Sequence, residues 1–235
     1  MMIGMDLPWK VLVSGLKDGA TITDNVVPIS VAPDGYTFSC ADAGKADAAT
    51  IGHYHVELDH ALVNMYCTPT TSISLQNVNA GPHILTVIPA TNAHDEVTKA
   101  AISVNFIYQP AKLLTAIVAA VNPGTPAIKI LSPAPGSSVS GDFTVTVDVK
   151  NFTVSEALFG KPNLAGYGHW HLNVDSLTSG MMGRGTMLGM SGSNTFQAST
   201  KGLPAGPHTF FAVLVDNQHA PLNPAVVASV ELVVK

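Results

Sequence analysis

Histidine is the residue type in this sequence whose spacing most clearly indicates chemistry. Eight of the nine histidines fall into two matching groups, each with a Gly-His-aromatic-His run followed by two further histidines. Neutral imidazoles are common protein ligands of zinc and copper, so both groups are candidate metal sites. The ninth, His60, has Ser176 in its place in the second group and is assigned no role. The eight residues are His53, His55, His83 and His94 in the first group and His169, His171, His208 and His219 in the second.

The His-x-His runs are expected to form β-strands. Alternate side chains of an extended strand share a face, so His169 and His171 project to one side while Trp170 projects to the other. His53 and His55 follow the same rule. The aromatic residues between the histidines then face the core of the predicted β-sandwich domain, and the imidazoles lie outside that core. A copper or zinc ion can bridge two such imidazoles if a third ligand arrives from a neighbouring strand or loop.

Strand pairing selects the third ligand. If the His-x-His strand pairs antiparallel with residues 207–215, the turn after that partner brings His219 beside His169, and His208 lies near Asp175. The same argument applies to the first group. The predicted metal ligands are therefore His53, His55 and His94 in one site and His169, His171 and His219 in the other. The alternative for these histidines is a packing or hydrogen-bond role.

His83 and His208 are open to two interpretations. The run Leu-Pro-Ala-Gly-Pro-His-Thr at 203–209 is similar to the tyrosine-corner step of β-sandwiches, in which an aromatic residue bonds back to the backbone. Alternatively, both histidines ligate a metal ion themselves or support a metal ligand from behind. Asp59 and Asp175, which close the two histidine strands, could orient a histidine or simply form a turn.

A methionine-rich loop follows the second histidine strand. Thioethers favour Cu(I), so these side chains are possible soft ligands beside the imidazoles, and copper is the predicted metal with zinc as the alternative. The other interpretation is that the methionines fill gaps where a glycine-rich loop folds over the sandwich. The residues are Met181, Met182, Met187 and Met190.

The histidine groups belong to an internal repeat. Residues 51–59 match 167–175, and the third and fourth histidines are eleven positions apart in both copies. Before the third histidine the second copy is about nine residues longer. Each copy shows about seven short strands separated by Gly, Pro, Asn and Asp turns, which predicts an all-β chain of two tandem immunoglobulin-like antiparallel β-sandwich domains. The predicted limits are 1–109 for the first domain, 110–123 for an apolar connector and 124–235 for the second.

Composition excludes several classes of partner. Only 11% of residues are charged against 46% hydrophobic, the formal net charge is -5, and no basic run is present, so nucleic acid is not an expected partner. No apolar run has the length of a membrane span. The N-terminus lacks the features of a signal peptide, so a secreted, periplasmic or cell-surface location is only an inference and implies a precursor that is already trimmed. Cys40 and Cys67 either form a disulfide or are two buried thiols.

The signature Gly-His-x-His-hydrophobic-x-Val/Leu-Asp, followed by Leu-Pro-x-Gly-x-His-Thr and a histidine before proline, resembles small bacterial exported histidine-rich domains of unknown function. The resemblance covers 168–221, whereas the first copy departs from it at 77–80 and at Asp95. It implies export and metal binding and no particular reaction. A more distant similarity is to copper-zinc superoxide dismutase, whose glycine-rich zinc loop and further aspartate ligand this sequence lacks.

Three functions are consistent with these features. The first is an exported metal-binding protein that stores, delivers or sequesters copper without turnover. The second is a structural or adhesive surface module that self-assembles, as a homo-oligomer or surface assembly, or binds a polymer through the apolar segments 1–13 and 112–121. The third is a copper redox enzyme. No catalytic residues are predicted, because nucleophile elbows and phosphate loops are absent from the sequence.

Overall fold

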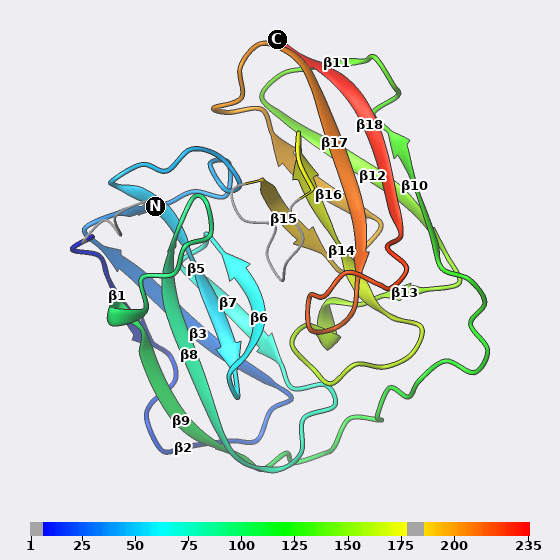
Figure 1. Cartoon of the computed structure of the whole chain (residues 1–235). Coiled ribbons are helices and arrows are strands. Elements are labelled where there is room, and N and C mark those ends of the chain that lie inside the picture. Colours follow the sequence, from blue (N-terminus) through cyan, green and yellow to red (C-terminus); the bar gives the residue numbers. More distant parts are fainter. Residues whose placement is uncertain (1–6, 178–185) are drawn as a thin grey trace.

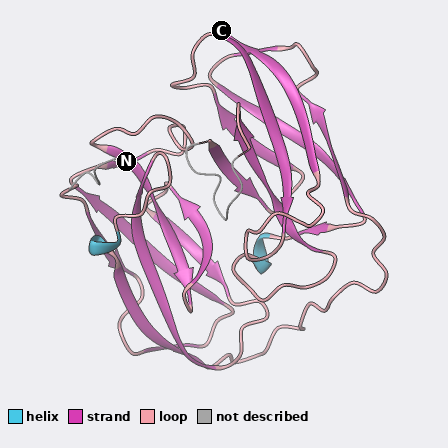
Figure 2. Ribbon diagram, in the orientation of Figure 1, coloured by secondary structure: helices cyan, strands magenta, loops and turns pink. Residues whose placement is uncertain are grey.

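The computed structural model describes residues 7–177 and 186–235 (Figure 1). Strands dominate this part of the chain, and its helices are two short 3-10 turns, Thr98–Ala100 and Glu156–Leu158 (Figure 2). Neither is long enough to cross a membrane. The sheets separate into one set built from β1 to β9 and another built from β10 to β18, which we call the N-terminal and C-terminal sandwiches.

The N-terminal sandwich has a three-stranded sheet in the order β1-β3-β7. It faces a larger sheet in the order β2-β9-β8-β5-β4, with β6 paired to β5. The strands are β1 (Lys10–Ser14), β2 (Ala20–Ile22), β3 (Val26–Asp34), β4 (Thr37–Phe38), β5 (Ile51–Leu58), β6 (Ala61–Tyr66), β7 (Thr70–Ser74), β8 (Gly81–Thr91) and β9 (Ile102–Tyr108).

The C-terminal sandwich repeats this layout. Its small sheet runs β10-β12-β16 and its large sheet β11-β18-β17-β14-β13, with β15 paired to β14. The strands are β10 (Ala127–Ser132), β11 (Ser138–Val139), β12 (Asp142–Lys150), β13 (Thr153–Val154), β14 (Tyr167–Val174), β15 (Met187–Ser191), β16 (Thr195–Ser199), β17 (Gly206–Val215) and β18 (Val227–Val234).

Both copies have the strand order of an immunoglobulin-like sandwich, which confirms the predicted fold class. The principal pairs are antiparallel, and the short strands at the sheet edges, such as β11 on β18, pair in parallel. Within the described residues each copy has nine strands rather than about seven, because these edge strands of two or three residues are too short to give a periodic signal.

Alternation of side chains produces the two cores. Tyr54 on β5 and Trp170 on β14 point inward between their histidine neighbours and are fully buried. Each satisfies its polar atom on a backbone carbonyl, Tyr54 Oη donating to Thr68 O at 2.8 Å and Trp170 Nε1 to Ser193 O at 2.7 Å. The histidines on either side of these aromatic residues consequently face away from the cores.

The two sandwiches lie side by side with their large sheets toward each other, and the connector between β9 and β10 passes beneath both of them in this view to the far side of the C-terminal sandwich (Figure 1). The interface is apolar at its centre. Phe159, Met187 and Met190 of the C-terminal sandwich belong to the same hydrophobic cluster as the core of the N-terminal sandwich. The outer face of each histidine strand is therefore covered by the other sandwich.

The N-terminal segment differs from the sequence-based expectation of an exposed apolar contact surface. Leu7, Trp9 and Val11 are buried in the core, and the pairing of β1 with β3 turns Val11 inward. Leu12 remains 65% exposed. The connector does expose apolar side chains, with Val118 exposed to 70% and Val121 to 89%.

Candidate metal centres

The first triad consists of His53, His55 and His94. His53 and His55 project from the same face of β5, and β5 pairs antiparallel with β8 so that His53 lies opposite Ala90. The turn after β8 then carries His94 back over that face. The Nε2 atoms of His53 and His55 are 3.0 Å apart, and Nδ1 of His94 lies 3.0 Å from Nε2 of His53.

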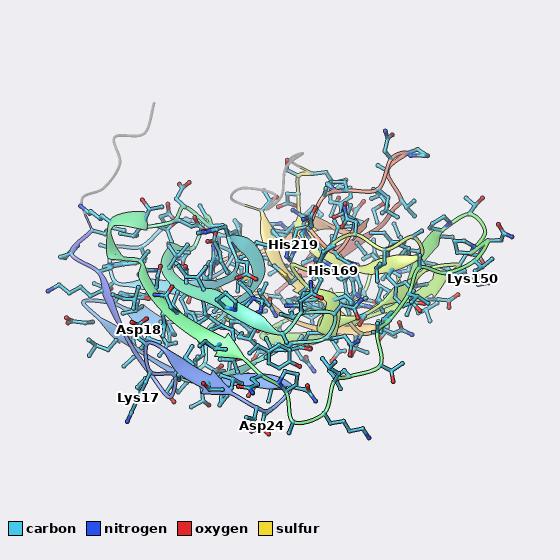
Figure 3. All side chains as sticks on the ribbon, turned by 90° about the horizontal axis from the view of Figure 1, so that it is seen from below. Lys17, Asp18, Asp24, Lys150, His169 and His219 are labelled. Atoms are coloured by element: carbon cyan, nitrogen blue, oxygen red, sulfur yellow. A yellow bond between two sulfur atoms is a disulfide. The ribbon has the colours of Figure 1, made fainter. Side chains whose placement is uncertain are left out.

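The second triad, His169, His171 and His219, has the same arrangement. His169 lies opposite Val215 on β17, as strand pairing predicts, and the following turn brings His219 over the face of β14. The Nε2 atoms of His169 and His171 are 3.0 Å apart, and Nδ1 of His219 lies 2.8 Å and 3.4 Å from them. Figure 3 shows His169 and His219 near the middle of the molecule, between the two halves.

Backbone geometry holds the third histidine of each triad in place. His94 and His219 have positive φ angles of 65° and 66°, in the left-handed region that histidine tolerates better than most residues. A buried asparagine two positions earlier fixes each turn. Asn92 Nδ2 donates to Ala46 O at 2.9 Å, and Asn217 Nδ2 donates to Pro162 O at 3.0 Å.

Hydrogen bonds on the far side of each ring determine which nitrogen keeps a lone pair. His94 Nε2 faces the carbonyl of Met187 at 2.7 Å and His219 Nε2 faces that of Leu62 at 2.9 Å. A carbonyl only accepts, so these nitrogens carry the proton and Nδ1 is left as a lone pair. His55 Nδ1 likewise donates to the Glu96 carboxylate at 2.8 Å, which leaves its Nε2 unprotonated.

Burial keeps these imidazoles neutral. Loss of solvation lowers the pKa of His94 to about 3 and that of His219 to about 4. Burial, and then the neighbouring histidines, lower the pKa values of His53, His169 and His171 well below the ordinary value. At neutral pH these rings are therefore in the state that binds metal.

The three nitrogens of each triad fit a metal ion. A tetrahedral ion bound at about 2.0–2.1 Å separates its nitrogen ligands by about 3.3 Å. The second triad has all three separations within 2.8–3.4 Å. In the first triad two separations are 3.0 Å, and all three nitrogens lie within 4.8 Å of one another. Nδ1 of His53 and Nδ1 of His169 are buried, and neither has a hydrogen-bond partner among the described residues. Three protein ligands leave a fourth position for water or another donor.

A methionine lies beside the central histidine of each triad. Met65 pairs with His55 across β5 and β6, and Met190 pairs with His171 across β14 and β15. Directly opposed residues of an antiparallel pair project from the same face of the sheet. Both methionines line a cavity of about 470 Å³ between the sandwiches, together with Lys45. Each cavity wall therefore carries a thioether next to a histidine strand.

The triads are deeply buried, although strand alternation alone places them on outer faces. All six histidines are 5% exposed or less. The other sandwich covers them, and each third histidine hydrogen-bonds to it. The two triads are also close enough that His94 contributes to lowering the pKa of His171.

His83 and His208 lie outside the triads, at the opposite end of β8 and β17. His208 Nδ1 faces Asp175 Oδ2 at 2.6 Å and its Nε2 faces Pro204 O at 2.8 Å. His83 makes the equivalent bonds with Asp59 at 2.7 Å and with the carbonyl of Asn79 at 2.8 Å. Both ring nitrogens are thus occupied by protein acceptors, the arrangement of a corner residue that fixes a turn.

The remaining predicted residues are placed as follows. Met187 is fully buried, and its backbone carbonyl rather than its thioether faces His94. Met181 and Met182 lie outside the described residues. Cys40 and Cys67 are joined by a disulfide, and the described part of the chain contains no free cysteine.

Sequence reasoning missed several groups around the triads. The Glu96 carboxylate and the carbonyls of Leu62 and Met187 gave no recognisable signal. A repeated Gly-Lys pair was a recognisable signal in the sequence. Gly44 precedes His53 by nine positions, and Gly160 precedes His169 by nine positions. These glycines lie against the other sandwich, and the lysines that follow them are buried.

Comparisons with known proteins find only distant similarity, to proteins built from fibronectin(III)-like or Ig domains among others. No family model and no curated protein matches the chain. Among solved structures, the fibronectin(III)-like modules of Clostridium thermocellum CbhA are 13% identical with a TM-score of 0.31, covering 96% of this chain and 94% of theirs. Latent PorU from Porphyromonas gingivalis is 9% identical with a TM-score of 0.30, and the four N-terminal Ig domains of a Dscam1 isoform are 13% identical with a TM-score of 0.26. The match covers 96% of this chain in both cases but only 20% and 46% of those proteins. None of these similarities assigns a ligand or activity to this chain.

Proposed function

We propose that this protein is an exported metal-binding protein that holds one ion at each histidine triad and stores, delivers or sequesters it without turnover. The observation that carries the proposal is the convergence of three buried imidazole nitrogens within 2.8–3.4 Å at the second triad. Such a set of neutral nitrogens in one place is costly unless a shared proton or a metal ion satisfies the lone pairs.

Copper is the proposed metal. The triads supply imidazoles, which bind Cu(II) well, and Met65 and Met190 place a thioether beside each histidine strand, which suits Cu(I). Zinc fits the same three nitrogens, but it gains nothing from a neighbouring thioether. A Met65→Leu plus Met190→Leu variant should bind Cu(I) more weakly and Zn(II) as before.

Metal content of protein purified without a histidine tag tests the proposal. We expect about two copper ions per chain after loading and dialysis, and about one in His53→Ala plus His55→Ala or in His169→Ala plus His171→Ala. The matched control is His83→Ala plus His208→Ala, which removes two histidines outside the triads and should leave two ions. A wild-type protein that retains no copper or zinc would overturn the proposal.

A secreted, periplasmic or cell-surface location accompanies this proposal. The Cys40–Cys67 disulfide supports it, because structural disulfides persist in oxidising compartments. Fractionation of cells that express the full-length gene would test the location.

A structural or adhesive module is the second candidate. Its support is the connector, where the apolar side chains of Leu113, Val118 and Val121 are 64–89% exposed. If this surface mediates assembly, the protein should sediment as an oligomer, and Val118→Lys plus Val121→Lys should give monomers. A monomeric wild type at about 100 µM would argue against self-assembly.

A further inference from the structure

The third histidine of each triad is oriented by the sandwich to which it does not belong. His94, from the N-terminal sandwich, donates Nε2–H to Met187 O of the C-terminal sandwich at 2.7 Å. His219 makes the reciprocal bond with Leu62 O of the N-terminal sandwich at 2.9 Å. Leu62 and Met187 occupy equivalent positions, opposite Glu57 and Asn173 in the histidine strands, so the interface has approximate two-fold symmetry.

These bonds determine whether the ring presents a lone pair to the triad. A proton on Nε2 leaves Nδ1 free to bind, whereas the other tautomer would turn a proton toward the ion. Hydrogen-bond partners behind a metal-ligating histidine typically contribute about 10- to 100-fold to metal affinity. Separation of the sandwiches would remove the acceptor from both third histidines at once.

Glycines allow the sandwiches to approach these same two carbonyls. A Cβ atom on Gly44 would lie 2.4 Å from Met187 O, and one on Gly160 would lie 2.5 Å from Leu62 O. Both distances are under 3.0 Å, a separation that real Cβ atoms essentially never show from a backbone atom. A larger residue at either position would therefore force the other sandwich away from the carbonyl that the histidine needs.

Polar contacts add to this interface at its rim. Lys45 Nζ donates to Ser199 O at 2.9 Å, and Lys201 pairs with Asp42 at 2.7 Å, each across the two sandwiches. The connector joins the sandwiches through residues 109–126, which form no strand or helix of their own. The docked arrangement therefore covers both triads, and the connector is a covalent link that would remain if the sandwiches separated.

We propose that the two metal sites are composite and reciprocal: each sandwich completes the site of the other, so metal binding and docking stabilise one another. The inference rests on the proposed metal-binding function. It means that the two ions are held behind one interface, and that release of either ion is coupled to opening of that interface. A delivery protein of this kind would discharge both ions in one event, triggered by a partner that separates the sandwiches.

The test places a substitution in one sandwich that weakens docking, and measures the metal affinity of the triad in the other sandwich. In the His169→Ala plus His171→Ala background only the first triad binds, and Gly160→Val, which touches no ligand of that triad, is added. Zn(II) affinity is measured on the full chain against a competing fluorescent chelator. We expect binding at least about tenfold weaker, because Met187 O withdraws from His94 when the sandwiches separate.

The matched control is Gly136→Val in the same background. Gly136 has a φ of 74° against 70° for Gly160, but nothing lies within 4 Å of its Cβ position, so it reproduces the backbone strain without the steric clash. Unchanged affinity with Gly160→Val would overturn the inference, as would an equal loss with Gly136→Val. Absence of Zn(II) and copper binding in the wild type would instead overturn the proposed function.

A reciprocal experiment, with the substitution in the N-terminal sandwich, tests the same inference if Gly160→Val does not fold. Gly44→Val in the His53→Ala plus His55→Ala background should weaken Zn(II) binding at the second triad by a similar factor. Gly19→Val is its control, since both glycines have a φ of 72° and nothing lies near the Cβ position of Gly19. Affinity equal to that of the control would overturn the inference.

Discussion

The carboxylate of Glu96 accepts a hydrogen bond from Nδ1 of His55 at 2.8 Å, and the described residues show no such carboxylate bond at the second triad. Glu96 forms a bridge with Ala90 just as Pro221 does with Val215, so proline stands in the C-terminal sandwich where glutamate stands in the N-terminal one. The hydrogen bond from His55 lowers the pKa of Glu96, which keeps it ionised. A carboxylate behind a histidine ligand fixes its tautomer and increases its basicity.

Replacing Glu96 by glutamine should weaken metal binding at the first triad by about tenfold and leave the second triad unchanged. The amide keeps the size of the side chain but removes its charge. Titration with Zn(II) against a chelator would resolve one weakened and one unaltered site. Glu231→Gln, at an exposed position of β18, is the control. An affinity of the first triad unchanged by Glu96→Gln would contradict the role assigned to Glu96.

Lys161 is a buried cation whose replacement should stabilise the protein. It is 3% exposed, and its Nζ has no hydrogen-bond partner in the described part of the chain. Burial lowers its pKa to about 8. Lys161→Met should raise the free energy of unfolding of the metal-free protein at pH 7 by about 2 kcal/mol, since the desolvation of the ammonium disappears.

The pH dependence of unfolding gives a second readout for Lys161. Its folded pKa lies below the unfolded value, so the unfolded state binds more protons, and stability should rise with pH between about 8 and about 10.5. That rise should be smaller in Lys161→Met and unchanged in Lys150→Met, whose side chain is 72% exposed. Parallel pH profiles for the wild type and Lys161→Met would contradict this account.

His208 should stabilise the C-terminal sandwich most strongly at acid pH. Burial lowers its pKa, but the bonds to the Asp175 carboxylate and the Pro204 carbonyl outweigh burial and raise it overall. Its stabilisation is therefore complete below the unfolded pKa of about 6.5 and is lost as pH rises through the folded value. His208→Ala should cost about 1–3 kcal/mol at pH 6 and less at pH 9. Urea unfolding at both pH values would show this, and an equal cost at both would argue for packing alone.

The disulfide should stabilise the N-terminal sandwich. Cys40 and Cys67 are separated by 27 positions and enclose β5 and β6. Cys40→Ser plus Cys67→Ser should lower the stability of this sandwich by roughly 2–4 kcal/mol, because the unfolded chain regains the freedom of that loop. Denaturation followed with and without a reductant would measure the loss, and insensitivity of the wild type to the reductant would contradict it.

Much of each triad follows from local pattern and strand pairing. The alternation of His53, Tyr54 and His55 determines which side chains share a face, because side-chain direction in a strand depends only on the backbone. Antiparallel pairing then brings the turn after β8 to the same end of the sheet. These arguments grouped His94 with His53 and His55, and separated His83 from them, without any knowledge of the packing between sandwiches.

Tertiary structure alone decided what surrounds the triads. Burial of His169 depends on the fit between two distant surfaces, which no periodicity within one strand encodes. The acceptors of His94 and His219 are backbone carbonyls, which every residue carries, so residue type could not mark them. The insertion between β14 and β15 also hid the equivalence of Leu62 and Met187. The sequence thus determined two three-histidine sets on two β-sandwiches, and only the docking of those sandwiches made each set depend on the other.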